Sequence, residues 1–161
     1  MPNTTLEEAM AGAEIIVEET PVCVINAETR VISVPDEYGF FGVSSDEKVK
    51  RIYFKCPKIV GDNIDLSTLD LYINYQNAEG YKNIYIIDDV EIDGDDITFS
   101  WLLSRYVTIA NGTVKYIVCA KKSENGNVVN EWNTKIAMGT VGIGLEAIAD
   151  CYWCFIKSKE N

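Results

Sequence analysis

Histidine is absent from this chain of 161 residues. It is the commonest general base in enzymes and the commonest metal ligand, so its absence excludes the usual serine and cysteine triads. Glycines at 138–144 (MGTVGIG) lack the lysine and serine of a phosphate-binding loop. The sequence therefore predicts no catalytic residue, no metal and no cofactor, although paired carboxylates, whose geometry is tertiary, leave a carboxylate enzyme as a third alternative.

Basic residues are few: 14 lysines and arginines face 25 acidic residues, which gives a formal net charge of −11. Such a chain repels phosphate backbones and anionic lipid surfaces, so neither nucleic acid nor a membrane is an expected partner. No apolar run reaches the roughly 20 residues of a membrane-spanning helix. The opening MPNTTLEEAM has no basic flank and no apolar core, so we expect no signal peptide and folding in a bacterial host cytoplasm.

Cysteine occurs five times, an odd number, at Cys23, Cys56, Cys119, Cys151 and Cys154. Most of these residues lie within apolar, strand-like runs, which predicts buried free thiols in a reducing compartment. The last two have CxxC spacing, but a structural zinc needs four ligands, and neither a second CxxC nor a histidine is present. On a strand the two thiols would face opposite sides, which favours packing over metal or redox chemistry.

Period-two alternation of apolar residues dominates the rest of the chain. In KVKRIYFKC, for example, Ile52, Phe54 and Cys56 share one face, which is typical of a half-buried strand. Turn residues such as Asn-Gly and Asp-Gly separate the runs. The pattern predicts an all-β protein, an antiparallel β-sandwich of jelly-roll or Ig-like type with eight or nine strands. The expected strands are 22–26, 30–34, 48–56, 69–75, 81–92, 96–103, 113–122, 131–141 and 151–156.

The amino-terminal segment differs from the rest. Residues 4–14, TTLEEAMAGAE, favour a short helix, because a threonine can cap it and Glu7 and Glu8 suit the dipole of its first turn. A helix of this length is marginal alone, so we expect an arm that docks on something. The predicted organisation is an arm or short helix over residues 1–20 followed by one β-sandwich domain over residues 21–161.

The stretch DDVEIDGDDITFSW, residues 88–101, resembles a calcium loop. Aspartates and a glutamate surround Gly94, as the calcium loop of a helix–loop–helix site requires. Counting from Asp89, however, the twelfth position holds Ser100 instead of the bidentate glutamate, and the flanks are strand-like. We therefore predict a two-residue Asp93-Gly94 hairpin, with an adventitious cation on the excess carboxylates as the alternative.

Aromatic residues supply the candidate interface. Trp101 and Trp132 lie on apolar strands and are expected in the core, although with Trp153 they are also candidates for a sugar-binding surface. The glycine-containing loop 34–48 is expected either to expose its aromatic residues to another chain or to pack them against its own body. The candidate interface combines this loop with both chain ends: Tyr38, Phe40, Phe41, Leu6, Met10, Trp153 and Phe155.

Several segments together, including CPKIVGDNIDLS at 56–67 and EWNT at 131–134 with its following GT, resemble a known family. The order of segments over residues 24–147 is similar to the N-terminal domain of baseplate upper proteins and of tail or head fibre proteins from bacteriophages of Firmicutes. The resemblance implies a non-enzymatic β-sandwich that anchors a larger structure to the virion. It carries no catalytic residues.

This sequence departs from the family's layout after the GLE segment at 144–146, where the family's proteins usually continue into a coiled-coil stalk. A small attachment, adaptor or decoration subunit of the baseplate, tail or capsid is therefore expected, located in the virion. Its expected partners are other virion proteins and further copies of itself. The alternative function is a carbohydrate-binding β-sandwich module that recognises a host cell-surface glycan.

Overall fold

The computed structural model describes residues 19–145. Most of the predicted arm, the predicted strand at 151–156 and four candidate interface residues lie outside this range; those four are Leu6, Met10, Trp153 and Phe155. The domain boundary at residue 20 and the oligomeric state stay predictions. Among residues 19–145, no helix has the length and apolar character needed to cross a membrane.

The described chain is built from strands and two short 3₁₀ helices, which confirms the all-β class. The helices are η1 (Asp36–Tyr38) and η2 (Leu66–Thr68). The strands are β1 (Cys23–Ile25), β2 (Ile32–Ser33), β3 (Phe40–Val43), β4 (Arg51–Pro57), β5 (Ile59–Val60), β6 (Ile64–Asp65), β7 (Asp70–Gln76), β8 (Lys82–Ile86), β9 (Glu91–Asp93), β10 (Asp96–Leu102), β11 (Gly112–Glu124), β12 (Asn127–Asn133) and β13 (Ala137–Gly142).

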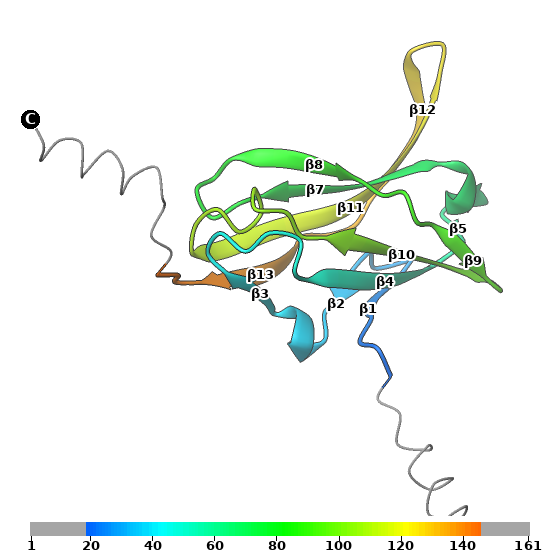
Figure 1. The fold of residues 1–161 in the computed structure, drawn as a ribbon. Helices are drawn as coiled ribbons and strands as arrows, with labels where there is room; N and C mark the ends of the chain where they lie inside the picture. Colours follow the sequence, from blue (N-terminus) through cyan, green and yellow to red (C-terminus); the bar gives the residue numbers. More distant parts are fainter. Residues whose placement is uncertain (1–18, 146–161) are drawn as a thin grey trace, which may run out of the picture.

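Two sheets pack face to face as a sandwich (Figure 1). The first sheet has the order β2-β1-β4-β10-β9, and the second has the order β3-β13-β11-β7-β8. β12 also belongs to the second sheet. It pairs with the C-terminal half of β11, while β13 pairs with the N-terminal half of the same strand. Most pairs are antiparallel, but β1 lies parallel to β4 and β3 lies parallel to β13.

The alternation predicted from the sequence is confirmed on the central strands. Ile52, Phe54 and Cys56 of β4 are buried, and the residues between them face outward. On β7 and β11 the same pattern buries one residue in two, with Cys119 as an additional buried residue on the outer side of β11. These inner faces close over a single apolar core, and burying apolar surface in this way is the main driving force for folding.

Aromatic rings fill the middle of this core. Trp101 of β10 is fully buried, and its ring centroid lies 5.6 Å from that of Phe41, 5.1 Å from that of Tyr116 and 5.4 Å from that of Tyr75. Trp132 is buried as well. The core positions expected for Trp101 and Trp132 are therefore confirmed, and the alternative in which these two rings line a sugar-binding surface is wrong.

Two hairpins show how turn chemistry sets the strand pairing. Between β11 and β12, Glu124 pairs with Asn127, and the loop residues Asn125 and Gly126 both have positive φ, as a type I′ turn requires. Between β9 and β10, Asp93 pairs with Asp96, so the two-residue loop is Gly94-Asp95. The hairpin was predicted correctly but one residue early, because Gly94, with φ 62°, takes the first loop position, where a type II′ turn needs glycine.

The remaining differences from the predicted strands are local. The expected strands 81–92 and 131–141 are each divided in two, and β3, β5 and β6 were not expected at all. β12 gives way to β13 at Thr134, whose backbone and hydroxyl both bond to Val118 of β11, and this lets one edge of β11 hold two consecutive strands. In Figure 1 the tip of the β11–β12 hairpin projects beyond the rest of the body.

Candidate interaction surface

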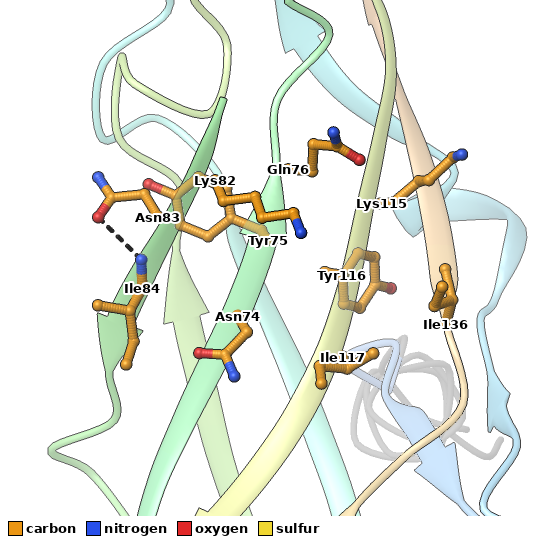
Figure 2. A pocket seen from close by; sticks show the side chains of 10 residues that line it. All are labelled: Asn74, Tyr75, Gln76, Lys82, Asn83, Ile84, Lys115, Tyr116, Ile117 and Ile136. Atoms are coloured by element: carbon orange, nitrogen blue, oxygen red, sulfur yellow. Dashed lines mark hydrogen bonds between the residues drawn. The ribbon is translucent and has the colours of Figure 1, made fainter. Parts of the chain in front are cut away.

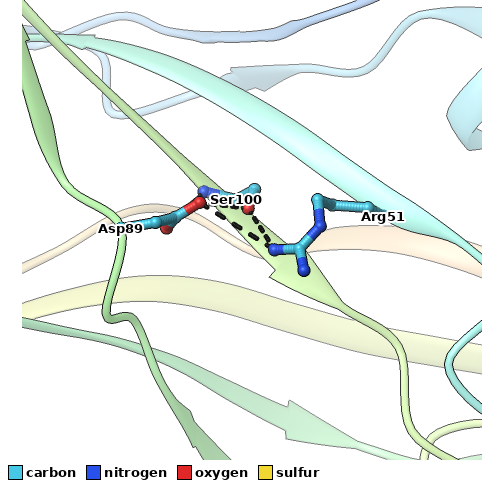
Figure 3. Close-up of polar contacts among 3 residues, drawn as sticks. All are labelled: Arg51, Asp89 and Ser100. Carbon is cyan, nitrogen blue, oxygen red and sulfur yellow. Dashed lines mark hydrogen bonds and ion pairs between the residues drawn. The ribbon is translucent and has the colours of Figure 1, made fainter.

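The acidic stretch closes the edge of the first sheet. β9 pairs with β10 only as far as Thr98, so the backbone N–H of Ser100 lacks a strand partner on that side. The carboxylate of Asp89 takes its place and accepts from the Ser100 N–H at 3.0 Å and from its hydroxyl (Figure 3). Arg51 donates to the same hydroxyl at 2.7 Å and lies 3.9 Å from Asp89. The arrangement satisfies a buried serine beside an edge strand.

The carboxylates of the adjacent turn are spread along the hairpin. Lys55 on the neighbouring strand β4 pairs with Asp96 at 3.6 Å and with Asp93 at 3.9 Å. Within residues 19–145, no group of three or more cysteine, aspartate or glutamate side chains is arranged to hold a metal ion. What the stretch does in this structure is form a turn and complete a sheet edge.

The sequence left two alternatives for the aromatic loop, exposure to another chain or packing against its own body, and two of its three aromatic residues are packed. Tyr38 is buried because the turn η1 folds it inward, and its hydroxyl donates to the Pro21 carbonyl at 2.6 Å. Phe41 is buried among the core rings. The ammonium of Lys50 holds the loop by donating to the carbonyls of Glu37 and Phe40. Phe40 alone remains half-exposed and available for contact.

Three thiols lie within the described residues, and all are buried and free. Burial raises the pKa of Cys23 to about 12 and that of Cys56 to about 12. Burial also raises the pKa of Cys119. A thiol with a raised pKa carries little thiolate at neutral pH, so these residues act as small apolar groups of the core. The prediction of buried free thiols is confirmed for these three; Cys151 and Cys154 lie outside the described residues.

The outer face of the second sheet carries several large apolar side chains that are exposed to solvent. Strand register places its residues in rows across β8, β7 and β11, such as Ile84–Asn74–Ile117 and Lys82–Gln76–Lys115. The row that ends at Lys115 continues to Met138 of β13. On the next strand, β3, Phe40 pairs with Thr140 of β13. Several apolar side chains on this face are about half exposed or more: Phe40 49%, Ile84 49%, Met138 56%, Ile136 63% and Ile86 66%.

A shallow groove of about 710 Å³ runs over this face (Figure 2), and we call it the lysine groove. Its outward side chains come from three neighbouring strands and the segment before β13: Asn74, Gln76, Lys82, Ile84, Lys115, Ile117 and Ile136. Apolar side chains form much of its surface, and two amides supply hydrogen-bonding groups. An apolar floor with a few polar groups is typical of surfaces that bind another chain.

The charge of the lysine groove is opposite to that of the chain. It contains two lysines and no acidic residue, although the chain as a whole has a net charge of −11. Among residues 19–145, neither Lys82 nor Lys115 takes part in an ion pair, whereas Lys55, Lys58 and Lys121 do. The groove is therefore an electropositive, partly apolar strip on an acidic molecule.

Of the three candidate interface residues that lie within residues 19–145, Phe40 is the one on the outer face of the second sheet. The sequence did contain a signal for the other part of this surface, the alternation Lys-Asn-Ile-Tyr-Ile of β8. In the structure β8 is exposed along most of its length. Its alternation was taken as ordinary strand patterning because only the register with β7 and β11 shows that Ile84 and Ile117 lie on one outer row.

No protein-family model matches the chain, and neither does any curated protein sequence. Among solved structures, the chain is similar to the N-terminal domain of phage TP901-1 ORF48, with a TM-score of 0.48 and 13% sequence identity. The match covers 76% of this chain and 95% of that chain.

Proposed function

We propose that the protein is a non-enzymatic structural component of a bacteriophage virion, an attachment, adaptor or decoration subunit of the baseplate, tail or capsid. The observation that carries the proposal is the outer face of the second sheet, which remains exposed and apolar although the body has a complete core of its own. A face of this kind serves to contact other protein chains.

The segment resemblance over residues 24–147 supports the same function, because it points to a domain that anchors larger structures to a virion. In such particles many copies act together, so weak contacts between subunits add up to firm attachment. The natural means of attachment are the exposed face and the segments at the two ends of the chain.

The proposal is tested on purified virions of the phage that encodes the chain. The amount of the protein relative to the major capsid protein is measured by quantitative mass spectrometry, for the full chain and for a variant lacking residues 1–18. We expect the full chain in the virion at a fixed ratio and at least a tenfold lower occupancy for the variant. A variant whose first 18 residues are replaced by a glycine-serine linker of equal length controls for chain length.

Two results would contradict the proposal at different levels. Absence of the full chain from virions overturns the structural function itself. Full occupancy of the truncated variant leaves the function standing but removes the amino-terminal segment as the means of attachment.

A further inference from the structure

We propose that the lysine groove binds residues 1–18 of a neighbouring copy of the same chain, so that copies join head to tail. The inference deepens the proposed function, on which it rests for its biological setting, by naming the partner of the exposed sheet face. It is carried by the charge of the groove, the composition of the segment and the place where the segment leaves the body.

Charge complementarity selects this segment. Residues 1–18 contain four glutamates, Glu7, Glu8, Glu14 and Glu18, and no lysine or arginine. The groove presents Lys82 and Lys115 and no acid. Residues 146–161 fit less well, because Lys157 and Lys159 offset most of the negative charge of their three acidic residues. Opposite charges attract across such a surface and set the orientation of the bound chain.

Apolar composition agrees with the same assignment. At helical spacing, Leu6, Met10 and Ala13 share one face, and Glu7 and Glu14 lie together along one side of that face. The groove offers a matching arrangement, because the row that holds Ile84 and Ile117 lies beside the row that holds Lys82 and Lys115. An amphipathic segment laid into an apolar groove is a common mode of peptide recognition, and each buried apolar side chain adds to its affinity.

The exit point of the segment favours a neighbour's groove. Residues 20–22 lie against outward-facing residues of the first sheet, including Tyr53 and Thr98, whereas the groove is on the outer face of the second sheet. In Figure 1 the start of the described chain lies below β1, while β7 and β8 form the top of the sandwich. Eighteen residues span at most roughly 60 Å, enough to reach an adjacent copy. Different surfaces of two copies in contact give a heterologous interface, which builds rings or filaments.

A charge-reversal exchange on the full-length chain tests the assignment. One variant reverses the groove (Lys82→Glu with Lys115→Glu), and the other reverses the segment (Glu7→Lys, Glu8→Lys and Glu14→Lys). The molar mass of each purified chain is followed by light scattering and sedimentation over a range of concentrations. The control variant carries Lys48→Glu with Lys122→Glu, the same charge change at exposed lysines outside the groove.

We expect the unaltered chain and the control variant to self-associate as concentration rises. Each reversed variant alone should associate at least tenfold more weakly, and an equimolar mixture of the two should recover association, because the basic segment of one fits the acidic groove of the other. Recovery in the mixture also shows that both variants are folded. A monomeric unaltered chain, or a mixture no better than its components, would overturn the inference.

Zero-length carbodiimide cross-linking identifies the contact directly. In a mixture of ¹⁴N-labelled and ¹⁵N-labelled full-length chain, we expect peptides joining residues 1–18 of one label to Lys82 or Lys115 of the other. Cross-links confined to one label would show that each segment folds onto its own body and would contradict the exchange between copies. Because these experiments use purified protein, they can fail while the chain is still found in virions, and the reverse also holds.

Discussion

At the scale of single residues, the tightest constraint in the core is the space above Gly139 of β13. A Cβ atom built there would lie 2.2 Å from Cε1 of Phe41. Phe41 cannot move aside, because its ring is buried against Trp101 and Tyr116. We therefore expect Gly139→Ala to lower the free energy of unfolding by about 1–3 kcal/mol, the usual cost of overpacking, as measured by urea denaturation.

Gly142 on the same strand provides the matched control. It faces outward, and a Cβ there would meet the ring of Phe40 at 3.3 Å, a half-exposed side chain with room to turn. Gly142→Ala should change the free energy of unfolding by less than about 0.5 kcal/mol, as ordinary surface substitutions do. Equal losses for the two variants would show that the change in strand propensity, rather than the Phe41 ring, sets the cost.

At the scale of elements, Asp89 completes the β9–β10 edge. Removing its carboxylate in Asp89→Ala would leave the Ser100 N–H and hydroxyl without their acceptor. Because Ser100 is fully buried, water would not readily take the place of the carboxylate. We expect a loss of about 1–3 kcal/mol in the free energy of unfolding, the typical cost of an unsatisfied buried polar group. Urea denaturation gives the total, and hydrogen exchange at the Ser100 amide should speed up in parallel.

The conservative variant Asp89→Asn separates hydrogen bonding from charge. Its single amide oxygen can still accept from the Ser100 N–H, but the oxygen that accepts from the Ser100 hydroxyl is replaced by an NH2 group. The variant should therefore recover about half of the loss while giving up the attraction to Arg51 at 3.9 Å. That ion pair is more than one-third exposed on both sides and contributes little. If Asp89→Asn were as unstable as Asp89→Ala, the carboxylate would matter through its charge instead.

Elements also show how far the sequence reaches. Period-two patterns identified the long strands, because one face of β4, β7, β10 and β11 is uniformly buried and the pattern records that directly. β3 was missed because its pairing is parallel to β13, about a hundred residues away, and its exposed-buried pattern of only four residues is broken by Gly42. The same limit applied to the candidate interface, since the rows of the lysine groove exist only through the register of three strands.

At the scale of the whole molecule, the two sheets share one core. A change inside that core therefore alters the free energy of unfolding of the whole domain. Cys23 and Cys56 both lie on inner strands of the first sheet. Their pKa values rise from the ordinary 9.0 to about 12, chiefly because burial disfavours the thiolate. The folded state therefore keeps both protons at a pH where the unfolded chain has lost them.

The sign of the pH dependence follows from this difference. Below pH 9 both states are protonated and the stabilisation is fully present; as pH rises from 9 towards 12, the unfolded state loses protons first and stability falls. Each thiol contributes about 1.4 kcal/mol per pH unit once it is ionised in the unfolded chain.

Between pH 8 and 10, the free energy of unfolding in urea with a reductant present should fall by about 2–3 kcal/mol. Cys23→Ala and Cys56→Ala should each remove about 1.4 kcal/mol of this fall, whatever their effect at pH 8, because alanine has no proton to lose. Cys119, whose pKa burial also raises, adds to the fall in the same direction. A flat profile for the unaltered chain would mean that the folded core admits the thiolates, and unaltered slopes in both variants would mean that other groups carry the pH dependence.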